Sequence, residues 1–174
     1  LGARIRPKGT NLIFQGLRKV ALLKRFSFYI ISIKKEEWNL FDSFLQEQTD
    51  LEAFEFVINS GSSSRIEKSL SHLNNKFHLT ELCLISPYWS LEALGNGLSK
   101  LTAIDKLTSL KLAGHYHDFL ARKESEQGIQ GLCEFIRKQK RSLKELEVDL
   151  LFVLEEKIVN NILSAISELE GLRD

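Results

Sequence analysis

A six-residue phrase, Leu-x-x-[Leu/Phe]-x-[Leu/Phe/Val], recurs along this 174-residue chain. It begins at five positions: Leu23, Leu51, Leu79, Leu107 and Leu143. The first four starts are each 28 residues apart and the fifth follows after 36. A single phrase of this kind is common in helical proteins, but three equal spacings in a row indicate an internal repeat.

The phrase has the alternation of a β-strand. Its fourth and sixth positions are apolar, and they point to one face because side chains alternate along a strand. The residues between them, such as Glu55, Lys111 and Glu147, then point to the opposite face. Each phrase therefore predicts a short strand with one buried and one polar face.

A helical pattern follows each strand phrase. In the third repeat it consists of Leu94, Leu98, Leu101 and Ile104, which recur with the period of a helix. Turn-forming residues such as Gly114 separate strand from helix. The matching positions elsewhere are Phe14, Leu17 and Val20; Trp38, Phe41, Phe44 and Leu45; Ile66, Leu70 and Leu73; Val159, Ile162, Ile166 and Leu169.

One strand–helix unit cannot bury its own apolar face, so neighbouring units must stack. We therefore predict an α/β solenoid over residues 1–174, with a parallel sheet on the concave side and helices on the convex side. Residues 1–22 fit the second half of an earlier repeat, and Leu172 opens a sixth phrase. The chain, which contains no Met, is expected to be cut within repeats at both ends and to leave Phe14, Leu17 and Val20 partly exposed. A doubly wound sheet is less favoured, because it requires no constant period.

These five phrases resemble the leucine-rich repeat family, in its helix-bearing 28-residue form similar to ribonuclease inhibitor. The resemblance implies a horseshoe that binds proteins. The family usually places Asn or Cys shortly after the third apolar position of the phrase, and in this chain only Asn59 matches that position.

Composition excludes several functional classes. The net charge of +1 gives no electrostatic reason to expect nucleic acid or an anionic membrane surface as a partner. The longest run without a charged residue has ten residues, Leu82–Leu91, which is too short to span a bilayer. Two cysteines do not make a disulfide framework, so a reducing, cytoplasmic location is expected.

The outward positions of the predicted strands form the first candidate binding site. Solenoids commonly bind partners on such an extended surface. This surface is basic at its first strand, acidic at its last and mildly apolar between (Val57, Ile85 and Ala113). The alternative is an ordinary solvated face of mixed charge. The candidate residues are Arg25, Tyr29, Glu55, Glu81, Lys111, Glu145, Glu147 and Asp149.

Two aromatic loops form the second candidate site. The fourth repeat is eight residues longer than its neighbours, and the extra length lies in residues 114–128, which include Tyr116 and Phe119. Tyr88 and Trp89 occupy the equivalent loop one repeat earlier. Insertions in repeat proteins often lie on the binding face, and aromatic residues often anchor partners. The alternatives are a tolerated surface insertion and packing of Trp89 over the following helix.

The sequence contains no strong catalytic or metal-binding motif. His115, His117 and Asp118 fall short of a usual metal site, which needs three or four converging ligands. Cys133 fits the core side of a helix, and Cys83 has no His in register. The pair Gly95 and Gly97 lies in a helical pattern and suits close helix packing better than phosphate binding. No enzymatic activity, cofactor or metal is expected.

The chain is therefore predicted to be a non-enzymatic interaction module or scaffold that binds another protein. One alternative is a regulator of a small GTPase, for which Arg65 and Arg122 are loop arginines. Others are a substrate adaptor of a ubiquitin ligase, or a structural segment of a larger assembly that uses its convex helices.

Overall fold

The computed structural model describes residues 10–17, 19–20, 23–30, 34–58, 63–86, 90–115, 126–151 and 156–172. Strands and helices alternate along the chain. The strands are β1 (Arg25–Ile30), β2 (Ala53–Ile58), β3 (Glu81–Ile85), β4 (Ser109–His115) and β5 (Glu145–Leu151). The helices are α1 (Thr10–Leu17), α2 (Lys35–Glu47), α3 (Ser63–Ser71), the short 3-10 helix η2 (His72–Asn75), α4 (Leu91–Ser99), α5 (Glu126–Lys138) and α6 (Glu156–Ser167).

The five strands form one parallel sheet in the order β1-β2-β3-β4-β5. Equivalent positions of the phrase stand side by side, so that Phe26, Phe54, Leu82, Leu110 and Leu146 form one continuous row. The predicted parallel sheet alternating with helices is confirmed, and all five strands lie on the repeated phrase.

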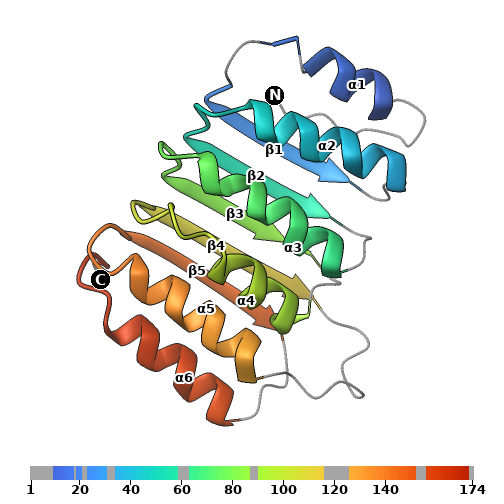
Figure 1. Ribbon diagram of the computed structural model, residues 1–174. Coiled ribbons are helices and arrows are strands. Elements are labelled where there is room, and N and C mark those ends of the chain that lie inside the picture. The colour runs from blue at the N-terminus through green and yellow to red at the C-terminus, as the bar shows by residue number, and fades with distance from the viewer. Residues whose placement is uncertain are drawn as a thin grey trace.

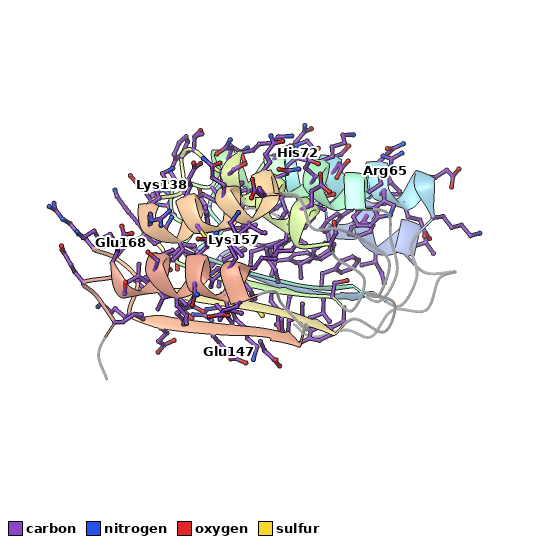
Figure 2. All side chains as sticks on the ribbon, turned by 90° about the horizontal axis from the view of Figure 1, so that it is seen from below. Arg65, His72, Lys138, Glu147, Lys157 and Glu168 are labelled. Atoms are coloured by element: carbon purple, nitrogen blue, oxygen red, sulfur yellow. The ribbon has the colours of Figure 1, made fainter. Side chains whose placement is uncertain are left out.

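The described helices lie on one side of the sheet, as Figure 1 shows in face view. Figure 2, turned by 90°, shows the same two layers from the edge, with Glu147 on the side away from the helices. A doubly wound fold covers both faces of its sheet with helices. Here the second face of the sheet carries no helix among the described residues.

The core lies between the sheet and the helices. Leu82, Leu84, Leu110 and Leu112 are at most 1 % exposed, and they pack against the buried faces of the helices. The N-terminal half of this core is aromatic, with the Phe28 ring 5.2 Å from that of Phe41. Burying each such side chain fully stabilises the fold by roughly 1.5–3 kcal/mol.

Two helix positions differ in burial from what the sequence suggested. Phe14 was expected to be partly exposed, but it is fully buried because its ring packs 5.0 Å from Phe28. Val159 was placed on the buried side of its helix, and this is wrong because Val159 is 37 % exposed. The side of α6 that faces the core instead carries Ile158, Ile162 and Ala165, whose spacing of four and three residues follows the helical period.

Glycines allow α4 and α5 to approach each other closely. A β-carbon on Gly95 would lie 1.7 Å from the carbonyl oxygen of Gly128. A β-carbon on Gly128 would lie 2.3 Å from the Cα of Glu92. The expectation that Gly95 and Gly97 serve helix packing is confirmed, since Gly97 also leaves space for the side chain of Leu70.

Candidate functional site

The face of the sheet that bears no described helix, here named the exposed sheet face, carries three rows of side chains, one from each outward position of the five strands. Parallel pairing with a constant register keeps each row continuous from β1 to β5. The first row is Arg25, Ala53, Glu81, Ser109 and Glu145; the second is Ser27, Glu55, Cys83, Lys111 and Glu147; the third is Tyr29, Val57, Ile85, Ala113 and Asp149.

The basic side chains of the first strand are paired within this face. Arg25 reaches across the small side chain of Ala53, and its Nη2 lies 2.5 Å from Oε1 of Glu81. Just before the strand, Lys24 Nζ lies 2.5 Å from Oε1 of Glu52. This contact raises the pKa of Lys24 and lowers that of Glu52. The end of the face that looks basic in the sequence is therefore neutralised by acidic residues of β3 and the segment before β2.

Two further contacts connect neighbouring strands. Lys111 Nζ lies 2.6 Å from a carboxylate oxygen of Glu147, which raises the pKa of Lys111. The Tyr29 hydroxyl donates a hydrogen bond of 2.6 Å to Glu55. That bond raises the pKa of Tyr29 to about 12, because it stabilises the protonated phenol. The side chains at these positions are thus held in place from strand to strand.

The acidic residues of the last strand are only partly compensated. Glu147 is paired with Lys111, whereas Glu145 and Asp149 have no ion-pair partner among the described residues. Negative charge therefore remains at the β5 end of the exposed sheet face, as the sequence suggested.

The third row supplies the apolar part of this face. Val57 and Ile85 are half-buried, Ala113 is buried, and Tyr29 is 41 % exposed. The row lies at the C-terminal ends of the strands. The aromatic loop residues predicted to lie beyond these ends, Tyr88, Trp89, Tyr116 and Phe119, fall outside the described residues, and their role stays a prediction.

The two thiols show no sign of nucleophilic activation. Cys83, in the middle of the second row, has its pKa raised to about 11 by burial, so it stays protonated at neutral pH. Cys133 is buried in the core side of α5, as predicted, and its pKa is also raised by burial. The described residues contain no group of three or more potential metal ligands. His117 and Asp118 lie outside that part of the chain.

A cluster of Asp42, Ser69 and His72 joins α2 to α3 and η2. It has the residue types of a hydrolytic triad but a different connection, because Ser69 Oγ donates its 2.7 Å hydrogen bond to Asp42 rather than to His72. Lys68 Nζ lies 3.1 Å from the same carboxylate. Asp42 and Ser69 are buried, and burial lowers the pKa of His72. The arrangement links helices and leaves no activated hydroxyl.

Buried glutamines clamp the backbone between repeats, a feature that the sequence analysis missed. Gln48 accepts a hydrogen bond of 2.8 Å from the Leu23 amide and donates to the Val20 carbonyl. Gln139 accepts one of 3.1 Å from the Leu107 amide and donates one of 2.9 Å to the carbonyl of Ile104. In the sequence, Gln48 stands three residues before the phrase at Leu51, and Gln139 stands four before the phrase at Leu143. This similar placement was the signal from which their role could have been inferred.

None of the described helices has the length and apolar character needed to cross a membrane. Comparison of the sequence with protein-family models and with curated proteins finds no match.

Proposed function

We propose that this chain is a leucine-rich-repeat solenoid, and that it acts as a non-enzymatic module binding another protein through the exposed sheet face and the adjoining loops. The 28-residue register of the strands and the position of the helices on one side support the solenoid. The protonated thiols and the unactivated Ser69 support a binding role rather than catalysis. Two free cysteines fit a cytoplasmic location.

The third row is the observation that carries this proposal. Val57 and Ile85 form an apolar centre between Tyr29 and Asp149, and fixed polar contacts lie beside it in the first two rows. Protein interfaces commonly combine an apolar centre containing aromatic residues with a polar rim. With strands about 4.8 Å apart, the row is roughly 19 Å long, which suits a segment of a partner protein.

The test is affinity capture from a native extract with the wild type and two variants of the exposed sheet face. One variant, V57D/I85D, places charge in the apolar centre. The other, E145K/E147K/D149K, reverses the acidic end. We expect both to lose at least about tenfold of the captured partner, because charge placed against an apolar or complementary surface opposes binding.

The matched control for E145K/E147K/D149K is E36K/E92K/E134K. It also replaces three acidic residues by Lys, but on exposed positions of α2, α4 and α5. Circular dichroism and thermal unfolding establish that all variants remain folded. A partner held equally by the wild type and both sheet-face variants, but lost by the helix control, would contradict the proposal and move the binding site to the helices.

A further inference from the structure

The inner strands β2, β3 and β4 place three charged side chains on the exposed sheet face: Glu55, Glu81 and Lys111. Glu81 is neutralised by Arg25, whose Nη2 lies 2.5 Å from its carboxylate. Lys111 is neutralised by Glu147 at 2.6 Å. Glu55 has no ion-pair partner among the described residues. Within the described part of the chain, Glu55 is thus the inner charge that lacks a counter-charge.

The immediate surroundings of Glu55 hold its carboxylate without cancelling its charge. Its neighbours in the second row are Ser27 on β1 and Cys83 on β3. The Cys83 thiol stays protonated, because burial raises its pKa to about 11. On the β1 side, Oε1 of Glu55 accepts the 2.6 Å hydrogen bond from the Tyr29 hydroxyl, which is a neutral donor.

Glu55 belongs to a set of four half-buried side chains in the middle of the exposed sheet face, here named the Glu55 group. Glu55 stands beside Cys83 in the second row, and Val57 stands beside Ile85 in the third. Neighbouring strands lie about 4.8 Å apart, and alternate residues of one strand lie roughly 6.6 Å apart. A negative charge and an apolar surface therefore adjoin each other within the reach of one Lys or Arg side chain, which combines an apolar stem with a charged head.

Partial burial of Glu55 restricts what can cover this group. An apolar partner surface would remove water from the carboxylate without replacing its hydrogen bonds, which costs free energy. An acidic side chain would be repelled. A cationic side chain would complete the ion pair, and the ring of Tyr29, which is 41 % exposed, adds an aromatic surface that favours a guanidinium group.

We propose that the Glu55 group binds an Arg or Lys side chain of the partner protein, with the cationic head on Glu55 and the stem against Val57 and Ile85. This inference rests on the proposed function and adds the chemistry that its binding face selects. The other two inner charges are already paired, so a single basic side chain flanked by apolar ones satisfies this part of the face.

The first test selects a displayed library of random peptides on the wild type and on Glu55→Gln, which keeps the shape of the side chain and removes its charge. We expect the wild type to enrich peptides that carry Arg or Lys next to apolar residues, and Glu55→Gln to lose that enrichment. The matched control is Glu81→Gln, which removes a carboxylate that Arg25 already neutralises. This control should enrich the same peptides as the wild type.

The second test measures the affinity of one enriched peptide by fluorescence anisotropy. Replacing its basic residue by Gln should weaken binding to the wild type at least about tenfold. The same replacement should not change binding to Glu55→Gln, because the charge pair is already absent there. Glu55→Lys should reverse the preference and bind the peptide that carries Glu in place of the basic residue. Circular dichroism establishes that the variants remain folded.

Several results would overturn the inference about Glu55: enrichment of no peptide, enrichment of peptides without a basic residue, or equal losses in Glu55→Gln and Glu81→Gln. Where peptides without a basic residue bind the wild type and are lost by V57D/I85D, the inference about Glu55 fails and the proposed function stands. The capture experiment described above judges the proposed function separately.

Discussion

At the scale of single residues, buried polar side chains hold successive repeats together. Gln48 and Gln139 each satisfy one amide and one carbonyl of the segment that leads into the preceding strand. A buried backbone group without a partner costs free energy comparable to a lost hydrogen bond. These glutamines therefore satisfy backbone groups of the loops, as the hydrogen bonds between strands satisfy those of the sheet.

Replacing Gln139 by Leu tests this role. The variant leaves the Leu107 amide and the Ile104 carbonyl without their side-chain partner in a buried site. We expect the free energy of unfolding, measured by urea denaturation, to fall by about 2–4 kcal/mol. The control Q130L changes an exposed glutamine of α5 and should alter stability by no more than about 0.5 kcal/mol. Equal effects of the two substitutions would contradict the clamp.

Lys76 makes stability depend on pH. Its side chain is fully buried, its Nζ donates to the Leu45 carbonyl, and burial lowers its pKa from 10.5 to about 8. Below pH 8 the ammonium is charged in both folded and unfolded states, and the cost of burying it is fully present. Between pH 8 and 10.5 the folded state binds fewer protons, so the free energy of unfolding rises with pH.

Between pH 8 and 10.5 we expect the free energy of unfolding to rise by roughly 1 kcal/mol per pH unit. This rise should be absent from the variant Lys76→Met. The measurement is urea unfolding at intervals from pH 7 to 10, with the variant subtracted from the wild type. Lys106→Met, which changes an exposed lysine, should keep the pH dependence of the wild type. A flat difference between wild type and K76M would show that Lys76 does not have the lowered pKa.

At the scale of elements, glycines set the distance between α4 and α5. Neither Gly95 nor Gly128 has room for a β-carbon, whereas one added to Gly16, an exposed position of helix α1, would meet nothing within 4 Å. We expect Gly128→Ala to lower the free energy of unfolding by about 1–3 kcal/mol through overpacking. Gly16→Ala should raise it by roughly 0.5–1 kcal/mol, because Ala favours helix. Thermal unfolding of both variants checks the opposite signs.

The sequence predicts the strands better than the contacts on their exposed side. Leu82 and Leu110 could be assigned to the core because a fixed phrase spacing brings apolar positions side by side. The ion pair of Arg25 with Glu81 could not be predicted. The neighbour of Arg25 in the row is Ala53, and the guanidinium reaches past it to the next strand. The role of the glutamines could not be predicted because Gln does not recur at one position of the repeat. Three residues before its phrase, one repeat has Gln48, whereas the next two have Lys76 and Ile104.

At the scale of the whole molecule, the two faces of the sheet have separate tasks. One face, with the helices, forms the core, while the other presents three ordered rows of side chains. We therefore expect substitutions on the exposed sheet face to test the proposed binding while leaving the core between sheet and helices intact. That separation is what makes V57D/I85D and E145K/E147K/D149K informative variants.

The junction between β4 and α5 shows how this sheet accommodates changes in chain length. Ser109 lies in register with Glu145 across 36 residues, just as Glu81 does with Ser109 across 28. Eight additional residues have thus left the alignment of the strands intact, whereas losing one residue inside a strand would exchange its two faces. For protein engineering, it follows that changes in chain length belong between the strands of this sheet and not within them.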